Sequence, residues 1–488
     1  MTHGMYNWFK KEGMALLTDF YELTMMAGYL HEKKADQEVC FEYFFRSLPP
    51  HTGFAVAAGL EPFLDYLEEL RFTADDIAYL RELGVFDEIF LDYLLGFRPS
   101  CTVRAIPEGT LVFPYEPIIQ IEGPIIEAQL IETALLNILN YQTLIATKAS
   151  RICLAAEGEP VFEFGLRRAH GPDGGLSGSR AAYIGGCTST SNVLAGKVYG
   201  IPVAGTHAHS WVMSFPSERE AFRAFARIYP KRCVLLVDTY DPVESGIPNA
   251  IAVFKEMQEQ GIPVRPAIRL DSGDLAKLSK IAYQMMTGAG LENPLIVASN
   301  ELHEDIIADL KRQKAKINAW GVGTSLITSY NCPALSGVYK LAAVKEKGSW
   351  LPRIKVTSNL EKATDPGKKQ IVRYFDADNH PIGDVLFEDG EAIPERGEIR
   401  GFHRNQPHIP QKIKNAAKAQ PLLEIVFKNG RRIRPPVPVH QIRERVQEQI
   451  QSLPEEYKRL RNPQIYDVML SENVGKLKER LIANPEQW

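Results

Sequence analysis

Short apolar runs alternate with amphipathic stretches between about residue 160 and residue 345, and this alternation limits the possible folds most strongly. Each run is continuously apolar, which is typical of a parallel strand buried on both faces. About seven such units in a row favour a (β/α) barrel over an open sheet. The predicted strands are residues 160–164, 201–204, 233–237, 264–270, 294–298, 317–322 and 337–344. The predicted helices are residues 179–197, a helix after the capping box at 217–220, residues 242–260, one from 272 and one capped by Asn300.

The regions on either side of this alternation mix helix and strand. We therefore predict an α/β fold, an irregular barrel of mostly parallel strands, with three parts: an N-terminal α+β domain (1–123), the barrel (124–345) and a C-terminal α+β extension (346–488) that packs on the other two. Predicted helices outside the repeat are 15–30, 73–83 with Thr73 as N-cap, 124–150, 439–453 and 474–484. Predicted strands there are 39–45, 110–113 and 118–121, and Asn429-Gly430 predicts a hairpin.

The charge balance argues against nucleic acid and anionic membranes as partners. There are 56 basic and 60 acidic residues, a net charge of −4, so an anionic substrate needs a local basic cluster. No apolar window approaches the length of a membrane span, and no signal peptide is evident. The six cysteines are scattered without a CxxC pair, which disfavours a zinc ribbon or a disulfide framework. We expect a cytoplasmic protein.

Polar residues follow nearly every predicted strand of the repeat. Because the active site of a parallel α/β barrel lies at the carboxyl ends of its strands, these residues predict one shared site. Ordinary loop polarity would explain one or two such segments, but six in succession favour a common function. The segments are residues 165–168, 205–210, 238–241, 269–274, 299–300 and 321–325.

The residue types in these segments suit phosphate and carboxylate ligands. Arg167, Arg168 and Arg269 carry planar donors. The loop 321–324 could present backbone N–H groups to a phosphate, or be only a tight turn. Three aspartates could bind Mg²⁺ or a ribose hydroxyl, or orient a histidine, although Asp271 and Ser272 could equally cap the next helix. These aspartates are Asp238, Asp271 and Asp274.

His207 and His209 form an ambiguous pair. On an extended strand, residues i and i+2 face the same way, which would suit a metal with His170 as a possible third ligand. The alternatives are one reactive histidine held by an aspartate, or histidines that only satisfy a polar core. The residues alone leave these possibilities open.

Seven motifs stand out along the chain. They are Leu17-Thr18-Asp19-Phe20-Tyr21-Glu22-Leu23-Thr24, Phe164-Gly165-Leu166-Arg167-Arg168-Ala169, Thr190-Ser191-Asn192-Val193, Gly205-Thr206-His207-Ala208-His209-Ser210, Asp238-Thr239-Tyr240-Asp241, Arg269-Leu270-Asp271-Ser272-Gly273-Asp274 and Gly323-Thr324-Ser325. Together and in this order, they resemble the nicotinate phosphoribosyltransferase family over nearly the whole chain, which is far more specific than any single motif. After about Lys368, no motif can be assigned.

The resemblance implies an enzyme of NAD biosynthesis that moves the phosphoribosyl group of phosphoribosyl pyrophosphate (PRPP) to nicotinate. It releases pyrophosphate and hydrolyses ATP alongside, with Mg²⁺ as cofactor, through a phosphorylated histidine that matches His209. His207 falls where the family motif is permissive, which argues against a metal pair. Some relatives carry a cysteine-rich zinc site; this chain lacks its cysteines, so no zinc is expected.

The resemblance also implies residue roles in a homodimer with shared active sites. Phe164 and Tyr21 of the partner subunit would stack on nicotinate. Its carboxylate would be held by Arg269, Ser191 and Thr206, with Arg167 close by. The implied PRPP site is Arg167, Asp271, Ser299, Gly323 and Thr324, and the implied catalytic set is His209, Asp238, Arg269 and Asp271, with Asp238 orienting the His209 ring.

Three alternatives remain open from the sequence. A nicotinamide phosphoribosyltransferase would be expected to carry an aspartate where this chain has Ser191, and a carboxylate there would repel nicotinate. A non-catalytic phosphosugar-binding protein would not turn over PRPP, and a metal-dependent hydrolase would contain stoichiometric metal. The sequence leaves open the ATP stoichiometry, any allosteric effector, the residues that hold Mg²⁺, the role of residues 368–488 and assembly beyond a dimer.

Overall fold

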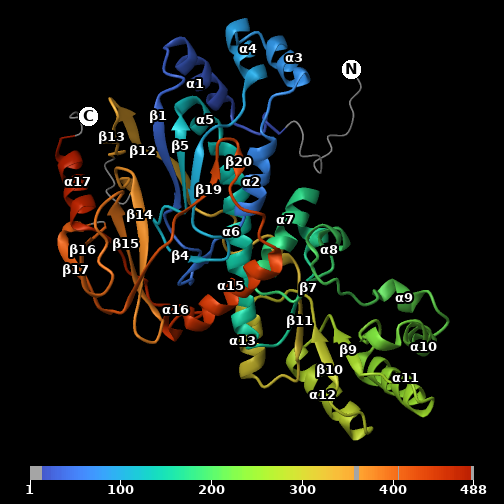
Figure 1. Cartoon of the computed structure of the whole chain (residues 1–488). Coiled ribbons are helices and arrows are strands. Elements are labelled where there is room, and N and C mark those ends of the chain that lie inside the picture. Colours follow the sequence, from blue (N-terminus) through green and yellow to red (C-terminus); the bar gives the residue numbers. More distant parts are fainter. Residues whose placement is uncertain (1–13, 357–361, 405, 485–488) are drawn as a thin grey trace. The chain divides into compact units, whose positions relative to one another are not determined.

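The computed structural model describes residues 14–356, 362–404 and 406–484, which form two compact units (Figure 1). One unit contains the chain up to Leu144 and again from Ala334 onward, and the other is Ile145–Pro333. The predicted boundaries at 123/124 and 345/346 stay predictions. Of the helices in the described part of the chain, none has the length and apolar character needed to cross a membrane.

The unit Ile145–Pro333 is built on a parallel sheet, as the apolar runs predicted. Its strands pair in the order β7-β6-β11-β10-β9-β8, and their residues are almost all buried. Pairing between described residues does not close the sheet from β7 to β8, so the predicted irregular barrel is not confirmed. An isolated parallel bridge joins Thr190 of β7 to Val203. The bounds are β6 (Val161–Glu163), β7 (Ser189–Thr190), β8 (Leu235–Leu236), β9 (Ala267–Leu270), β10 (Leu295–Ala298) and β11 (Ala319–Val322).

Helices alternate with these strands along the chain (Figure 1). Ser217 caps α10 as predicted, by accepting a hydrogen bond from the backbone N–H of Glu220. The helices are α7 (Gly171–Ile184), α8 (Val193–Tyr199), α9 (His209–Met213), α10 (Glu218–Ile228), α11 (Ile247–Glu259) after a π-helical turn at Pro242–Gly246, α12 (Leu275–Gly288), α13 (Glu304–Arg312) and α14 (Thr324–Ile327).

Four predictions for the repeated strands and helices need correction. The helix predicted at 179–197 is interrupted: α7 ends at Gly185-Gly186, where Gly186 has a φ of +122°, and β7 intervenes before α8. The N-cap of α13 is His303 rather than Asn300. Residues 201–204 contribute only the bridge at Val203, and the strand predicted at 337–344 belongs to an antiparallel sheet.

The other unit contains a seven-stranded sheet in the order β13-β12-β1-β5-β3-β19-β20. At its centre, β1 (Glu38–Phe45) pairs antiparallel with β5 (Ile119–Pro124) and with β12 (Gly337–Glu346). The predicted Asn429-Gly430 hairpin is confirmed by β19 (Glu424–Lys428) and β20 (Arg431–Arg432). The remaining strands are β3 (Thr102–Ala105) and β13 (Ser349–Pro352), and β2 (Ala55–Val56) pairs separately with β4 (Leu111–Val112).

The helices of this part follow the predictions with shifted ends. The predicted helix 15–30 begins only at Phe20, because Asp19 has extended backbone, and the predicted helix 124–150 divides at Ile131. Thr73 caps α3 through a capping box with Asp76. The helices are α1 (Phe20–His31), α2 (Leu60–Glu69), α3 (Ala74–Glu82), α4 (Glu88–Gly96), α5 (Ile125–Leu130) and α6 (Glu132–Ala155), whose last turns enter the parallel-sheet unit.

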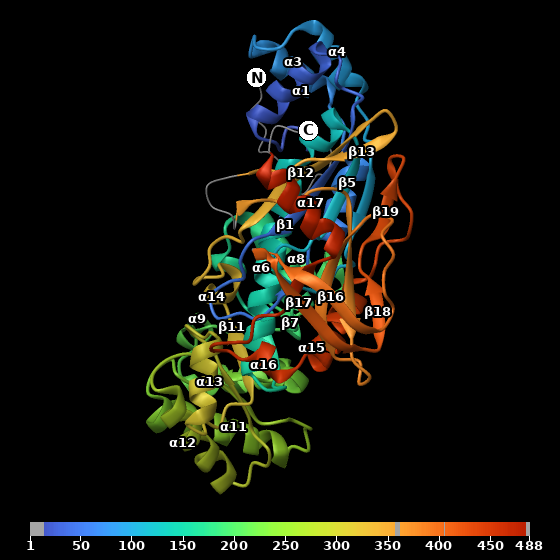
Figure 2. The same ribbon diagram turned by 90° about the vertical axis from the view of Figure 1, so that its left-hand side faces the viewer.

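A second, six-stranded sheet holds the C-terminal part of this unit, in the order β17-β16-β21-β15-β14-β18. Figure 2 shows α17 beside β16. The core of the sheet includes Tyr374, Phe387 and Met469. The bounds are β14 (Lys369–Phe375), β15 (Pro381–Glu388), β16 (Gly397–His403), β17 (Gln406–Ala416), β18 (Lys418–Pro421), β21 (Val468–Leu470), α15 (Val439–Ser452), α16 (Glu455–Lys458) and α17 (Glu472–Ala483).

A buried ionic cluster lies in the same unit. The carboxylate of Asp365 accepts hydrogen bonds from Nε of Arg404 at 2.6 Å and from Nζ of Lys478 at 2.7 Å. All three side chains are buried. Burial raises the pKa of Asp365, but the positive charges of Arg404 and Lys478 outweigh burial and lower it to about 2. This cluster is therefore ionised at neutral pH.

Candidate active site

Arg269 is the centre of a hydrogen-bonded group at the carboxyl end of the parallel sheet. It lies on β9, and its guanidinium donates from Nε to Oγ of Ser299 at 2.7 Å and from Nη1 to Oγ1 of Thr206 at 3.2 Å. Its Nη2 donates to Oδ1 of Asp271 at 2.9 Å. Each partner follows a strand or the bridge at Val203, so adjacent strands bring these side chains together. The sequence predicted all four residues for one site.

The aromatic ring of Phe164 lies beside this group. Phe164 follows β6, and the Arg269 guanidinium is 5.9 Å from the ring centroid. A side chain at Gly321 would approach the Phe164 ring atoms to 2.8 Å, so glycine is required for this close packing. Gly323 lies against the backbone of Phe164, and Thr324 opens the short helix α14. The arrangement places an aromatic face, a guanidinium and a small-residue loop on neighbouring strand ends.

Asp271 is held as a carboxylate. Burial raises the pKa of its carboxyl, but the hydrogen bond from Ser299 and the charge of Arg269 together lower it below its ordinary value. Ser299, which is buried, donates to Oδ1 of Asp271 and accepts from Arg269. The structure therefore presents a charged arginine and a charged aspartate side by side at the sheet edge.

The His209 ring contacts Thr239 and Asp271. Its Nδ1 lies 3.1 Å from Oγ1 of Thr239, and its Nε2 lies 3.8 Å from Oδ2 of Asp271. The side chain is 42% exposed, so this ring is accessible. Asp238, predicted to orient the ring, instead accepts hydrogen bonds at Oδ2 from the Asp271 N–H and the Ser272 hydroxyl, each at 2.7 Å. Its other oxygen, Oδ1, is buried with no hydrogen-bond partner among the described residues.

His207 belongs to the core. Its Nε2 accepts a hydrogen bond from the N–H of Leu236 at 3.2 Å, and its ring packs edge-on against Phe225. Burial is the main cause that lowers its pKa to about 4, so the ring is neutral. The premise of a shared strand is wrong, because His209 begins α9. Of the described residues, the group with three potential metal ligands in reach of one another is Asp376, Asp378 and His380, far along the chain.

Other predicted residues lie outside the Arg269 group. Arg167 and Arg168 are exposed on the turn Leu166–Arg168, and Asp274 caps α12 through the Lys277 N–H. Tyr21 lies on α1 in the other unit and is 46% exposed. Ser191 follows β7, and its N–H donates to the Glu163 carbonyl at 2.9 Å.

Sequence reasoning missed a buried polar network under the site. Glu163 at the end of β6 is fully buried and accepts hydrogen bonds from the Gly165 N–H and from the hydroxyls of Ser179 and Thr190. Asn192 donates to Ser179 and caps α8. The available signal was a glutamate inside an otherwise apolar run. These contacts fix the loops that carry Phe164 and Ser191.

Comparison with known proteins identifies the family. The model of the nicotinate phosphoribosyltransferase N-terminal domain matches residues 16–140, the family model matches residues 161–380, and the C-terminal domain model matches residues 368–478. A nicotinate phosphoribosyltransferase of Bacillus subtilis is 46% identical over 470 residues, covering 95% of this chain and 94% of the relative. This chain belongs to the nicotinate phosphoribosyltransferase family.

Two human comparisons agree with this assignment to the nicotinate phosphoribosyltransferase family. The nicotinate phosphoribosyltransferase of Homo sapiens is 36% identical over 525 residues, covering 96% of each chain. The crystal structure of human nicotinic acid phosphoribosyltransferase superposes with a TM-score of 0.84 at 34% identity, covering 95% of this chain and 99% of that one. Residues 368–478, in which no motif could be assigned, thus form the C-terminal domain of the family.

Proposed function

We propose that this chain is a nicotinate phosphoribosyltransferase of NAD biosynthesis, which forms nicotinate mononucleotide and pyrophosphate from nicotinate and PRPP, coupled to ATP hydrolysis. Family membership, with a 46% identical relative covering 95% of the chain, supports the reaction. The observation that carries the assignment of the site is the Arg269 group, where one guanidinium is held by three side chains beside an aromatic ring.

Nicotinate offers a carboxylate and an aromatic face, and the site has a partner for each. Arg269 would pair with the carboxylate, with Thr206 and Ser191 as hydroxyl donors and Arg167 close by. Phe164 would stack on the ring. Because Ser299 and Asp271 already hold the guanidinium, little freedom is lost when the acid binds. An aspartate in place of Ser191, as expected for a nicotinamide enzyme, would repel the acid.

PRPP would lie along the same sheet edge. Gly323, Thr324 and Ser299 would contact its phosphates, and Asp271 its ribose hydroxyls. The reaction develops positive charge on the ribose and negative charge on the departing pyrophosphate. The chain therefore contributes orientation and fixed charges rather than proton transfer.

The residues present fit Mg²⁺. Oδ1 of Asp238 is buried without a hydrogen-bond partner, and Asp271 beside it is ionised, so two oxygen ligands of the kind that Mg²⁺ prefers lie on adjacent strand ends. Asp238 and Asp271 would hold the ion, which when bound would neutralise phosphate charge. The site offers no thiolate ligand, so zinc is not proposed.

A product assay separates the candidate functions. Purified protein is incubated with PRPP and either nicotinate or nicotinamide, with and without ATP, and both mononucleotides are measured with pyrophosphate. We expect nicotinate mononucleotide, with faster formation in ATP. Nicotinamide mononucleotide as the main product would favour the alternative enzyme, and no pyrophosphate release would favour a binding protein.

His209 is proposed as the residue that ATP phosphorylates. Thr239 holds Nδ1, which leaves the exposed Nε2 to attack the γ-phosphorus of ATP, with ADP as leaving group. Asp271, 3.8 Å away, would repel the new phosphate, and the Mg²⁺ that Asp238 and Asp271 would hold would offset this repulsion with its positive charge. The added charge would organise the groups that bind PRPP.

We expect His209→Asn to abolish the label from γ-labelled ATP and the ATP stimulation, while a slower ATP-independent transfer remains. The label on the wild type should be acid-labile and alkali-stable. The loss should appear mainly as weaker PRPP binding, because Arg269 and the Gly323 loop are intact. His207→Asn is the matched control and should keep the label. Full ATP stimulation in His209→Asn would rule out this assignment.

The proposed assembly is a homodimer in which Tyr21 of the partner subunit stacks on nicotinate. The exposed ring of Tyr21 is available for such a contact. Tyr21→Ala and Arg269→Ala chains, each strongly impaired alone, should regain activity when mixed, because one site of the mixed dimer is then intact. Activity assays after subunit exchange, with sedimentation to establish the dimer, test this. A fully active monomer would contradict it.

We also propose that the parallel sheet is part of an irregular barrel and that the protein is cytoplasmic. The bridge from Thr190 to Val203 extends the parallel pairing beyond β7, as an irregular barrel requires. None of the six cysteines, all among the described residues, forms a disulfide and four are buried, which supports a reducing cytoplasmic location.

A further inference from the structure

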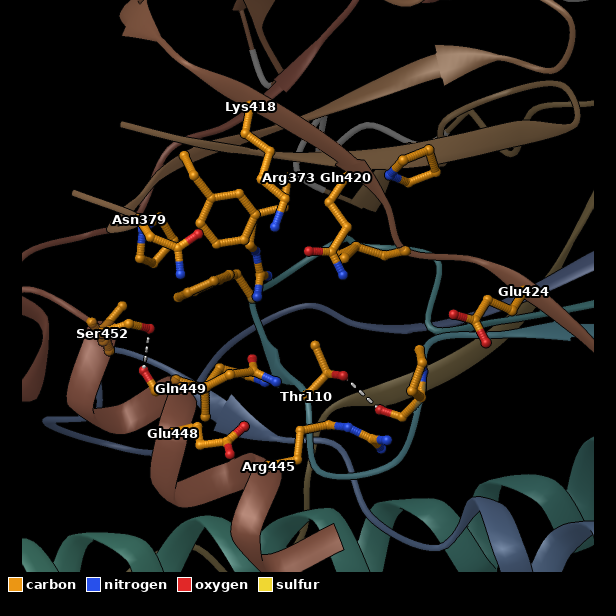
Figure 3. Close-up of a pocket in the computed structure, with 18 residues that line it drawn as sticks. Thr110, Arg373, Asn379, Lys418, Gln420, Glu424, Arg445, Glu448, Gln449 and Ser452 are labelled. Carbon is orange, nitrogen blue, oxygen red and sulfur yellow. Dashed lines mark hydrogen bonds between the residues drawn. The ribbon is translucent and has the colours of Figure 1, made fainter. Parts of the chain in front are cut away.

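A cavity of ≈ 390 Å³ lies in the C-terminal part of the unit that does not contain the parallel sheet (Figure 3). Its walls come from four segments: the loop before β4, the β14–β15 hairpin, β18 with the residues that follow it, and α15. Phe113, Phe375 and Leu453 supply apolar surface. The cavity has the size of a small-ligand site, and the strand-end site described above contains none of its residues.

Arg373 provides a buried cation in the cavity wall. The side chain is 4% exposed, and it donates from Nε and Nη2 to the carboxylate of Asp384, at 3.0 Å and 2.7 Å. The guanidinium also lies over the rings of Phe113 and Tyr466. Its Nη1 has no hydrogen bond to any described residue. The arginine is thus fixed in place, and the N–H groups of Nη1 are left for a ligand.

Two further cations line the cavity from other directions. Lys418 on β18 lies over the ring of Phe375, with Nζ 4.9 Å from the centroid, and no described carboxylate pairs with it. Arg445 on α15 donates from Nη1 to the Glu108 carbonyl. The pKa of Arg445 is lowered, mainly by burial and secondly by the positive charge of Arg434. Figure 3 shows Lys418 and Arg445 entering from opposite walls.

Side-chain amides and two carboxylates complete the lining. The side-chain amides of Asn379 and Gln420 have no hydrogen-bond partners among the described residues. The side-chain oxygen of Gln449 accepts a hydrogen bond from the Leu111 N–H, which leaves the amide nitrogen of Gln449 available. Glu424 is paired with Arg434 at 3.3 Å, whereas Glu448 has no paired cation in the described chain. Amides together with one free carboxylate suit a ligand with several hydroxyl groups.

We propose that this cavity is a second binding site, for a phosphorylated sugar or nucleoside monophosphate. The phosphate lies among Arg373, Lys418 and Arg445, and the hydroxyl groups contact Asn379, Gln420 and Glu448. A planar carboxylate is disfavoured, because Asp384 already occupies the fork of Arg373. Three cationic groups that approach from three directions fit a tetrahedral phosphate better.

Calorimetric titration of the full chain tests the proposal. The probes are ribose 5-phosphate, AMP and inorganic phosphate, each titrated into the wild type and into Thr324→Ala, so that any binding at the strand-end site is recognised by its sensitivity to Thr324. Lys418→Ala should weaken binding of the sugar phosphates at least about tenfold, because it removes a charge-assisted contact. Lys414→Ala, an exposed lysine on neighbouring β17, is the matched control and should stay within about twofold.

Hydrogen exchange gives a second measurement. Ribose 5-phosphate or AMP should protect residues 418–424 and 439–453. Equal weakening by Lys414→Ala and Lys418→Ala would overturn the proposal, as would no binding by any probe. Inorganic phosphate binding as tightly as both sugar phosphates would also overturn it, since the hydroxyl contacts would then contribute nothing.

Discussion

Replacing Arg269 by alanine should lower kcat/KM for nicotinate roughly 100-fold and remove most of the preference for nicotinate over nicotinamide. A charge-assisted hydrogen bond contributes roughly 1.5–3 kcal/mol, and every 1.36 kcal/mol changes the rate about tenfold. The substitution also frees Ser299 and Thr206, which Arg269 now holds. Steady-state kinetics with nicotinate and with nicotinamide measures both the loss of kcat/KM and the change in preference between the two substrates.

Arg265→Ala is the matched control for this variant. Arg265 is exposed and lies before the amino end of β9, whereas Arg269 lies near the carboxyl end of the same strand. We expect kcat/KM of Arg265→Ala to remain within about twofold of the wild type. Comparable kcat/KM of the wild type for nicotinate and nicotinamide would contradict carboxylate recognition by Arg269.

Replacing Asp365 by alanine should destabilise the protein by about 3–5 kcal/mol, the usual cost of leaving buried charges without their partner. Arg404 and Lys478 would both lose the carboxylate that neutralises them. Urea denaturation at pH 7, followed by circular dichroism, measures the change. Glu479→Ala is the matched control, because Glu479 is exposed on the same helix as Lys478, and it should change stability by less than about 0.5 kcal/mol.

The contribution of Asp365 to the free energy of unfolding also depends on pH. Its folded pKa of about 2 lies below the ordinary value of 3.8, so the folded state binds fewer protons there than the unfolded state. The stabilisation is fully present above about pH 4 and is lost as the pH falls through 2. The difference in stability between wild type and Asp365→Asn should therefore shrink over this window. A constant difference between pH 7 and pH 2 would show that the charge of Asp365 is not responsible.

The parallel strands and the polar residues after them could be predicted from the sequence. A continuous apolar run such as residues 294–298 reports burial on both faces directly, and the ends of parallel strands must meet at one edge. For that reason the sequence predicts that Arg269, Thr206, Asp271 and Ser299 share one site, and their hydrogen bonds confirm that they lie together. The order of neighbouring strands alone decides which residues gather at this edge of the sheet.

The partners of individual side chains could not be predicted in the same way. Asp238 and Thr239 are adjacent in sequence, and which of them meets the His209 ring depends on a local backbone turn. Likewise, the apolar run at 337–344 has the pattern of a buried parallel strand, yet it pairs antiparallel with β1 because its partner comes from residues 38–45. Periodicity reports burial and carries no information on the partner strand.

The pairing of β1 with β12 sets the order in which this protein can be completed on the ribosome. The backbone N–H of Arg46, directly after β1, donates to the carbonyl and to the side-chain hydroxyl of Ser336, 290 positions later in the chain. At a synthesis rate of roughly 5–20 residues per second, the ribosome needs about 15–60 s to make the chain between Arg46 and Ser336. One edge of β1 can meet β5 early, but the other stays open to foreign strands throughout this interval. A nascent chain stalled before Gly337 should therefore need chaperone protection, whereas one stalled after Glu346 should not.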